Sequence, residues 1–332
     1  MKGIQIREPH HLELVDLPDP EVGPGEVMVR ILKAGLCGTD IHLYEGHFGN
    51  FPIIPGHDAV GIIEKVGEGV SSKLIGSRVT IDPASCCLRS SLPVSLCPAC
   101  ERGDTHLCIH GTYMGISEMG ALRELVVVPE KRVIPLPKEI DDLSATNLEP
   151  VAVALHLLEK ISGRSGSALV IGGGPIGIMC ALALQEKVET VWLSEPIEKR
   201  RTLAKDLGVQ NIVSPLQLDE NFKFKMIIEA SGHYTAIDTI LKNSMPGSTI
   251  ILVGGGIDIP GVIILTRELE ILAVKGGKGL YPEAISWSIL KKINLQLMVS
   301  HIFPARKAEE AFYTASQKKS DVTRVALDMT DW

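Results

Sequence analysis

The stretch Ala168-Leu169-Val170-Ile171-Gly172-Gly173-Gly174-Pro175-Ile176-Gly177 decides the fold of this chain. Its four leading apolar residues predict a buried strand, and the apolar run at 176–185 predicts a helix after the glycine turn. The glycines form the pattern G-x-G-x-x-G, which permits a tight turn, a close approach of backbone to a pyrophosphate and close helix–strand packing. The sequence therefore predicts a dinucleotide-binding turn made by Gly172, Gly174, Pro175, Ile176 and Gly177.

Strands and helices alternate around this turn, which predicts an α/β fold with a doubly wound parallel sheet. The mean hydropathy of +0.19 then reflects buried strands. The uncharged stretch 165–185 is long enough to span a bilayer, but the glycine turn interrupts it. Helices are predicted at 151–160, with Pro150 as first residue, and around 203–205, and strands at 190–193, 226–228, 250–253 and 262–265.

The half of the chain before about residue 145 has a different pattern. Short strand-like segments such as 27–32 and 125–128 alternate with Gly and Pro, which predicts a mostly-β domain. A length of 332 residues is enough for two domains. The segments 299–304 and 324–327 could extend either half, and the local pattern does not decide which.

Composition excludes several classes of protein. Hydrophobic residues make up 45% and charged residues 22%, as in ordinary globular proteins. The net charge of −7 offers no basic surface, so we expect neither a nucleic-acid nor a membrane partner. Five of the seven cysteines lie between Cys86 and Cys108, and residues 1–15 lack the apolar core of a signal peptide, so we expect a reducing cytoplasm.

Clustered cysteines in such a compartment indicate metal before disulfide. Cys97, Cys100 and Cys108 have the spacing C-x2-C-x7-C, which suits thiolates around a tetrahedral structural zinc. A redox role for C-x-x-C would leave Cys108 unexplained. The fourth ligand is open at this point between Cys86 and Cys87, with His106 as a weaker candidate.

A second set of metal-ligating residues is scattered along the mostly-β half. It comprises Cys37, His57, Asp58 and Glu149, each of which alone is typical of a core or turn position. Together they supply the sulfur, nitrogen and oxygen ligands of a catalytic zinc that keeps one position open. This set predicts chemistry as well as binding.

Glu195 follows the strand after the glycine turn, where an acidic residue bonds the ribose hydroxyls of the coenzyme. A carboxylate there repels a 2′-phosphate, which favours NAD over NADP. Lys199, Arg200 and Arg201 argue for NADP unless they face solvent. We assign Glu195 and Arg200 to the coenzyme site.

From the N-terminus to the last strand, these motifs resemble those of the zinc-dependent medium-chain alcohol/polyol dehydrogenase family. Cys37-Gly38-Thr39-Asp40 and Gly56-His57 are similar to its catalytic-zinc motifs, the cysteine group to its structural-zinc loop, and Val170–Gly177 to its coenzyme turn. The segment Glu149–His156 resembles the branch of sorbitol, butanediol and threonine dehydrogenases more than the ordinary alcohol dehydrogenases.

The resemblance implies a mostly-β GroES-like catalytic domain and a Rossmann coenzyme domain with the doubly wound parallel sheet. The catalytic domain would comprise residues 1–149 and 298–332, with a structural-zinc lobe at about 82–110, and the Rossmann domain residues 150–297. The resemblance also implies a homodimer or homotetramer in which strands near 262–265 pair across subunits.

The activity implied is NAD-dependent oxidation of a secondary alcohol in a small polyol, sugar, diol or threonine-like molecule. Zinc would polarise the hydroxyl and lower its pKa. By resemblance, Thr39 and His42 would pass the proton to solvent.

The chain departs from the family pattern at two places. Asp58 stands where the family has Glu, so either Asp58 or Glu149, or both, could bind the catalytic zinc. Val94 stands where the first cysteine of the lobe is expected by spacing. Counted from Asp82-Pro83, Cys87 takes that place, and Cys86 is the reserve.

These departures motivate one alternative, a catalytically inactive zinc- and dinucleotide-binding sensor or assembly protein of the same fold. A zinc-free quinone or enoyl reductase is a further alternative, but such a protein would have no use for either set of metal-ligating residues.

Overall fold

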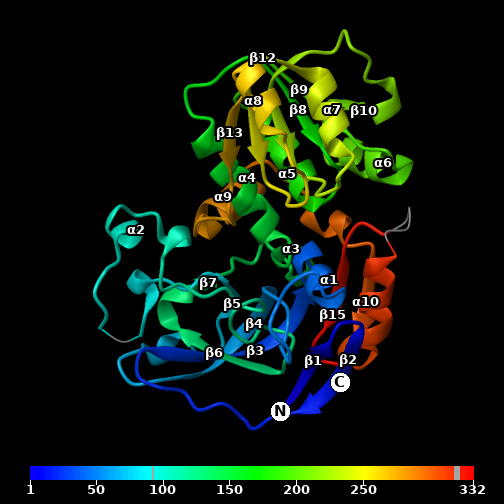
Figure 1. The fold of residues 1–332 in the computed structure, drawn as a ribbon. Helices are drawn as coiled ribbons and strands as arrows, with labels where there is room; N and C mark the ends of the chain where they lie inside the picture. Colours follow the sequence, from blue (N-terminus) through cyan, green and yellow to red (C-terminus); the bar gives the residue numbers. More distant parts are fainter. Residues whose placement is uncertain (92, 318–321) are drawn as a thin grey trace. The chain divides into compact units, whose positions relative to one another are not determined.

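The computed structural model describes residues 1–91, 93–317 and 322–332 (Figure 1). The chain forms two compact units, one of Met1–Glu149 with Tyr281–Trp332 and one of Pro150–Leu280. From the resemblance we expected the second domain to extend to residue 297, whereas the second compact unit ends at Leu280, and helix α9 (Tyr281–Leu290) belongs to the first unit.

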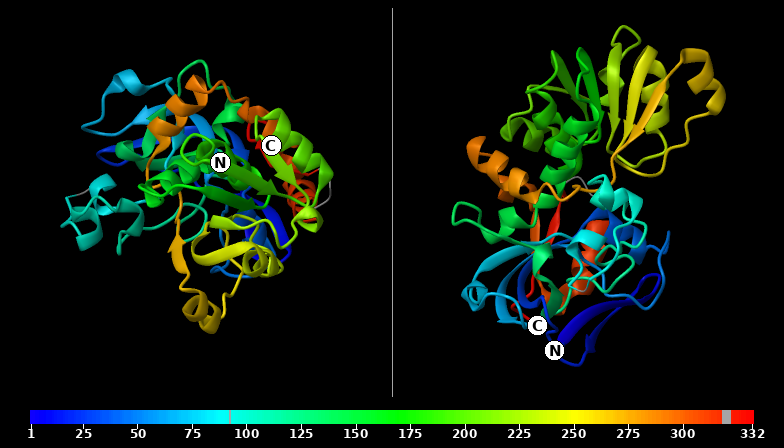
Figure 2. Two further views of the ribbon diagram at one scale, coloured as in Figure 1. Left: turned by 90° about the horizontal axis from the view of Figure 1, so that it is seen from above. Right: turned by 90° about the vertical axis from the view of Figure 1, so that its left-hand side faces the viewer.

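The second unit is built on a six-stranded sheet in which every neighbouring pair is parallel. Its strand order, β10-β9-β8-β11-β12-β13, is the Rossmann order, with the topological switch between β8 and β11. Figure 2 shows the strands side by side. The strands are β8 (Ser167–Ile171), β9 (Thr190–Ser194), β10 (Asn211–Val213), β11 (Phe224–Glu229), β12 (Ser244–Leu252) and β13 (Glu270–Ala273).

Helices of this unit connect the parallel strands. The uncharged stretch 165–185 folds as β8 followed by α5, as predicted, and α5 packs on β8 and β9. None of the helices within the described residues is long and apolar enough to cross a membrane. The helices are α4 (Leu148–Lys160), α5 (Pro175–Leu184), α6 (Glu198–Asp206), α7 (Ala236–Asn243) and α8 (Gly261–Arg267).

The predicted strand at 262–265 is wrong, because these residues form the middle of α8. Strands β12 and β13 run parallel, so the chain between them must cross over the sheet, and a helix makes that crossover. Val262 and Leu265 are 63% and 77% exposed, which a doubly buried strand would not allow.

Helix α4 begins earlier than predicted. Pro150 is its third residue and not its first. The N–H groups of the first helical turn have no partner inside the helix, so proline is tolerated there without breaking a bond.

The first unit contains a seven-stranded sheet with the order β14-β15-β3-β4-β5-β7, and β6 pairs with β3. Strand β15 runs antiparallel to β3, with Ala326 opposite Gly35, so the end of the chain returns to the N-terminal sheet as the resemblance implies. The strands are β3 (Glu26–Gly35), β4 (Asp58–Val66), β5 (Arg78–Ile81), β6 (Leu125–Pro129), β7 (Val133–Pro135), β14 (His301–Pro304) and β15 (Val325–Asp328).

Both termini lie in this unit (Figure 1). A separate antiparallel pair precedes the main sheet, and the core beneath it includes Ile4, Ile31 and Phe312, which are fully buried. The pair is β1 (Lys2–Glu8) and β2 (His11–Asp16), and the helices are α1 (Gly38–Tyr44), α2 (Pro98–Glu101), α3 (Asp142–Ala145), α9 and α10 (Ala308–Ser316).

Candidate active site

Strand register brings the catalytic candidates of the first unit together. Gly35 at the end of β3 lies opposite Asp58 at the start of β4 and opposite Ala326 in β15. The residues just beyond these positions therefore meet at one edge of the sheet. Cys37 comes from the β3 side, His57 from the β4 side and Arg324 from the β15 side.

Cys37, His57 and Asp58 each place one ligand atom within 4.8 Å of the other two. The Nε2 atom of His57 is 4.0 Å from Oδ2 of Asp58. Neighbouring ligand atoms around a tetrahedral zinc are about 3.3–3.8 Å apart, given zinc bonds of about 2.0–2.3 Å. Small side-chain shifts would therefore bring the three onto one ion, and the donor set fits zinc.

Glu149, in the first turn of α4, is not among these three, but it lies in the same buried group of charges. Burial and then the charge of Asp58 raise the pKa of Glu149 to about 7. Burial opposes a charged His57, but Asp58, Asp40 and Cys37 raise the pKa of His57 well above its usual value. Several buried carboxyl groups therefore lie close together in this region. A bound divalent cation would offset the repulsion between their negative charges.

Arg324 is a member of this group that the sequence interpretation missed. Its Nη2 donates to Oδ2 of Asp58, and the two residues are only 5% and 4% exposed. Oδ1 of Asp58 has no hydrogen-bond partner among the described residues. No local pattern could reveal the pair, because 266 residues separate its members.

Asp40 was also missed as a site residue. It is fully buried and accepts hydrogen bonds from the backbone N–H groups of Cys37 and Gly56, both at 2.8 Å. Its Oδ1 lies 3.9 Å from Nδ1 of His57. Asp40 therefore ties together the two segments that carry metal-ligating residues. A signal was present, because an acidic residue three positions after a helix N-cap is typical of a capping box.

The two candidates for proton transfer lie on α1. Thr39 is in the first turn, and its Oγ1 is 3.7 Å from Sγ of Cys37. His42 is three residues later, on the same side of the helix, and its side chain is 41% exposed. Thr39 therefore lies beside a metal-ligating residue, and His42 lies nearer to solvent.

Tyr113 is a further residue of this group. Its hydroxyl donates to Oε1 of Glu149 at 3.5 Å, and its ring meets the ring of His57 edge-on, with 5.5 Å between centroids. Burial and then the charge of Glu149 raise the pKa of the Tyr113 hydroxyl well above its usual value. The tyrosine stays neutral and can donate to the buried carboxylate.

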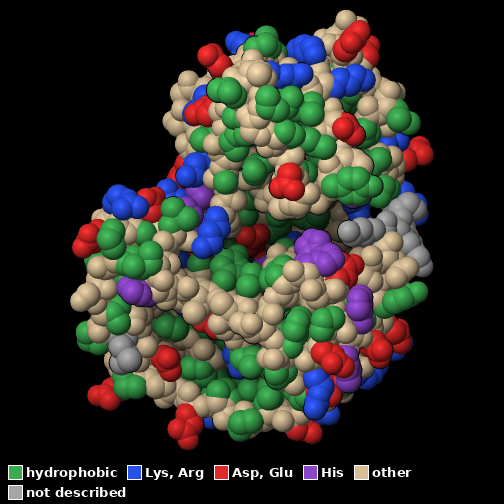
Figure 3. All heavy atoms as spheres, viewed as in Figure 1, with side chains coloured by type: hydrophobic (Ala, Val, Ile, Leu, Met, Phe, Trp, Pro, Cys, Tyr) green, Lys and Arg blue, Asp and Glu red, His purple; other side chains and the backbone are tan. Residues whose placement is uncertain are grey.

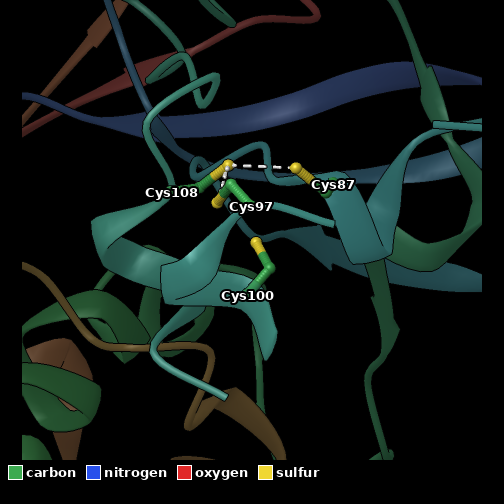
Figure 4. Close-up of side chains that lie close together, drawn as sticks. All are labelled: Cys87, Cys97, Cys100 and Cys108. Atoms are coloured by element: carbon green, nitrogen blue, oxygen red, sulfur yellow. Dashed lines mark hydrogen bonds between the residues drawn. The ribbon is translucent and has the colours of Figure 1, made fainter. Parts of the chain in front are cut away.

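The structure brings four cysteines of the lobe together, and Cys87 is in the group while Cys86 is outside it (Figure 4). Sγ of Cys108 lies 3.5 Å from Sγ of Cys87 and 3.7 Å from Sγ of Cys97. Sulfur atoms around a tetrahedral zinc are about 3.8 Å apart, given zinc–sulfur bonds of about 2.3 Å. The thiol groups of Cys87, Cys97, Cys100 and Cys108 therefore fit a closed zinc site.

The local environments of these thiols differ. Backbone N–H groups, first that of Cys100, lower the pKa of Cys97 to about 6. Burial raises the pKa of Cys100 to about 12. Four adjacent thiols cannot all ionise without a cation, so the group is suited to a metal ion that takes their protons' place.

In the second unit, the glycine turn follows β8 at the switch point of the sheet. Gly172 has φ = +106°, a conformation that strains other residues, and a Cβ on Gly177 would lie 1.8 Å from the carbonyl oxygen of Gly172. A Cβ on Gly174 would meet nothing within 4 Å. Pro175 and Ile176 open α5, so open space lies at the helix N-terminus, where a pyrophosphate binds.

Glu195 lies directly beside this turn and is buried. Its Oε2 accepts from the N–H of Gly173 at 2.6 Å and its Oε1 from that of Ile197 at 2.8 Å. Arg201 donates to the backbone carbonyls of Glu195 and Pro196 at 2.8 and 2.6 Å. Arg201 therefore stabilises the backbone that carries Glu195. Arg200 is half-buried on α6.

Comparison with known proteins agrees with this geometry. Residues 23–138 match the alcohol dehydrogenase GroES-like domain. The chain is 31% identical over 338 residues to L-threonine 3-dehydrogenase of Pyrococcus furiosus, covering 94% of both chains. The chain belongs to the zinc-dependent medium-chain alcohol and polyol dehydrogenases.

Two further relatives of this family match the whole length. Starvation-sensing protein RspB of Escherichia coli K12 is 29% identical over 346 residues and covers 100% of both chains. An alcohol dehydrogenase from Escherichia coli CFT073, solved with NADH, has 27% identity and a TM-score of 0.87 over 99% of both chains. Another solved relative holds NADP. The family membership makes this chain a zinc-type dehydrogenase of alcohol groups that binds a nicotinamide dinucleotide.

Proposed function

We propose that this dehydrogenase uses NAD to oxidise a secondary alcohol in a small polyol, sugar, diol or threonine-like molecule. The observation that carries the proposal is the buried group of Cys37, His57 and Asp58, whose ligand atoms lie within 4.8 Å of one another. The name of the threonine dehydrogenase relative supports the substrate class.

Cys37, His57 and Asp58 would hold the catalytic zinc. Asp58 offers its carboxylate, whose Oδ2 also accepts from Arg324 and whose Oδ1 has no hydrogen-bond partner among the described residues. Glu149 is the nearby reserve, and its buried carboxyl accepts from Tyr113. When bound, the metal polarises the hydroxyl of the substrate and lowers its pKa. Three ligands come together among the described residues, which would leave one coordination position for the substrate.

Thr39 and His42 supply the route for the proton. The Thr39 hydroxyl can both donate and accept, and it lies beside Cys37, 3.7 Å from its sulfur. His42, whose side chain is 41% exposed, would pass the proton to solvent. Helix α1 thus carries one candidate beside a proposed zinc ligand and one at the surface.

For the coenzyme, we propose NAD. The 2′-phosphate of NADP would lie close to the buried carboxylate of Glu195, and the two negative charges would repel each other. Arg201 could have balanced the phosphate, but backbone carbonyls hold it. Arg200 is the remaining cation assigned to the coenzyme site. The expected result is a higher kcat/KM with NAD than with NADP, and a strong NADP preference would contradict the role of Glu195.

The central experiment measures NADH formation over a panel of polyols, sugars, diols and threonine, with zinc content determined on the same sample. Cys37→Ser should abolish turnover and lower the zinc content by one ion per chain. Cys86→Ser is the matched control, because this buried cysteine lies outside both groups of ligands. Near-normal turnover in Cys37→Ser, or in zinc-depleted protein, would overturn the proposal.

We also propose that the chain forms a homodimer or homotetramer through the second unit. Strand β13 is at the end of the strand order, and an edge strand presents backbone groups for pairing. Val262 and Leu265 on the neighbouring α8 expose large apolar side chains. A second copy of this chain would cover both features. Sedimentation that shows only monomer at micromolar concentration would contradict this.

A second function remains a candidate because one full-length relative is named a starvation-sensing protein. In that case the chain would bind zinc and dinucleotide without catalysis. Coenzyme binding without turnover on any alcohol of the panel would favour it.

A further inference from the structure

A third group of metal-ligating side chains lies apart from the two described above. It consists of His42 on α1 and of Glu45 and His47 just after it, and one ligand atom of each lies within 4.8 Å of the others. Figure 3 shows histidine side chains gathered on the surface over α1. The side chains are 41%, 20% and 58% exposed, so ions in solution can reach them.

The backbone fixes this group through the way in which α1 ends. The N–H of His47 donates to the carbonyl of His42 at 3.0 Å, and the N–H of Gly46 donates to that of Leu43 at 3.0 Å. These two bonds, with Gly46 at φ = +77°, form a Schellman motif. The motif places the residue two positions past the cap against the third residue before the cap, and here both residues are histidines. The cluster is therefore preorganised.

The separations suit one metal ion. Nδ1 of His42 lies 2.9 Å from Nδ1 of His47. Oε2 of Glu45 lies 3.7 Å from the first nitrogen and 3.8 Å from the second. Ligand atoms around a tetrahedral ion with bonds of about 2.0–2.1 Å are about 3.3–3.4 Å apart. One of the three separations is shorter than this value and two are longer. Side-chain shifts of a few tenths of an ångström would therefore place all three atoms around one ion.

We propose that His42, Glu45 and His47 bind a divalent transition-metal ion of the zinc, nickel or copper class. Two imidazoles and one carboxylate favour these ions, whereas magnesium and calcium prefer all-oxygen sites. The ion would keep one or more water ligands because the cluster is exposed. The site is separate from the four-cysteine group and from the group of Cys37, His57 and Asp58.

Occupation of this site has a consequence for turnover, which rests on the proposed function. The ion binds Nδ1 of His42, and His42 carries the proton at the exposed end of α1. Nickel at saturating concentration should therefore slow NADH formation in the native chain. The same concentration should have less effect on His47→Ala, which keeps His42 but loses a metal ligand.

The binding test does not depend on activity. Untagged, zinc-loaded protein is titrated with NiCl2 by calorimetry, and the metal content is then measured. We expect one nickel per chain with no loss of zinc, and no binding of MgCl2. His47→Ala and Glu45→Gln should each weaken nickel binding by about tenfold or more, since even indirect partners of metal ligands are worth that much.

His11→Ala is the matched control, because His11 is an exposed histidine 3.5 Å from the carboxylate of Glu8. It should bind nickel as the native chain does. The proposal is overturned if the native chain takes up no nickel beyond its zinc. It is equally overturned if His47→Ala binds with unchanged affinity, or if His11→Ala weakens binding as much. A protein that oxidises the substrate but binds no nickel would contradict this inference and leave the proposed function intact.

Discussion

Replacing Arg324 with methionine tests how the catalytic edge of the first unit is held together. The side chain of methionine fills similar space, but it leaves Asp58 without its cation. Both residues are about 95% buried, and one carboxylate oxygen already lacks a partner among the described residues. Removing one member of such a buried ion pair costs about 3–5 kcal/mol. In a domain of this size that loss lowers Tm by about 6–20 °C.

The assay is calorimetric unfolding of zinc-free protein, in which no bound ion can take the place of the arginine beside Asp58, with Arg306→Met as the matched control. Arg306 pairs with Asp331 in the same C-terminal segment, but the two side chains are 49% and 51% exposed. That pair should contribute no more than about 1 kcal/mol. The reasoning is refuted if Arg324→Met lowers Tm no more than Arg306→Met does.

A double variant separates the ion pair from general loss of packing. In Arg324→Met with Asp58→Asn, neither member of the ion pair leaves an unpaired charge behind. The two losses should then be non-additive, with a coupling of about 1–3 kcal/mol. Strict additivity would show that the cost comes from packing and not from the unpaired carboxylate.

Three other outcomes are expected. Gly174→Ala should keep the native Tm and lose affinity for NADH in a fluorescence titration, because its Cβ enters the space meant for the pyrophosphate. Gly177→Ala should lower both the Tm and the affinity for NADH, because its Cβ would collide with the turn. Equal behaviour of the two variants would contradict the assignment. Cys100→Ser, or removal of zinc by a chelator, should open the lobe at 82–110 to proteases, and an equally resistant lobe would argue against a structural metal. Gly46→Ala should cost about 1–2 kcal/mol and weaken nickel binding, because a left-handed alanine is strained and its Cβ would lie 2.6 Å from Pro9; unchanged nickel affinity would show that the Schellman turn does not organise the site.

Local pattern was sufficient for the parts of the fold in which one residue run determines one element. The glycine turn and its flanking strand and helix were predicted because their apolar residues, glycines and lengths all indicate the same structure. The run at 262–265 was misassigned because apolar β-branched residues suit a buried strand and an exposed crossover helix alike. Only the parallel pairing of β12 and β13 distinguishes these possibilities.

Individual residues of the candidate site could be predicted from the sequence, but their arrangement in space could not. Spacing singled out Cys37, His57 and the cysteine lobe, yet it could not show that Cys87 joins the sulfur group while Cys86 does not. Arg324 had no signal, because its role depends on a strand pairing across most of the chain. The division of the chain after residue 280 likewise depends on contacts between segments far apart in the sequence.

The pairing of β15 with β3 also determines how late in synthesis the N-terminal sheet can be completed. Asp58 precedes Arg324 by 266 residues, so at about 5–20 residues per second it is made roughly 13–53 s earlier. During that time Asp58 lacks its arginine, and the end of β3 at Lys33–Gly35 has no neighbour on the side that β15 takes. Unpaired strand edges invite association with other chains, so the nascent N-terminal sheet is the stage of biogenesis most exposed to aggregation. A stop codon in place of Arg324 would remove the arginine, β15 and the last residues of the chain, and would leave the sheet permanently in that condition.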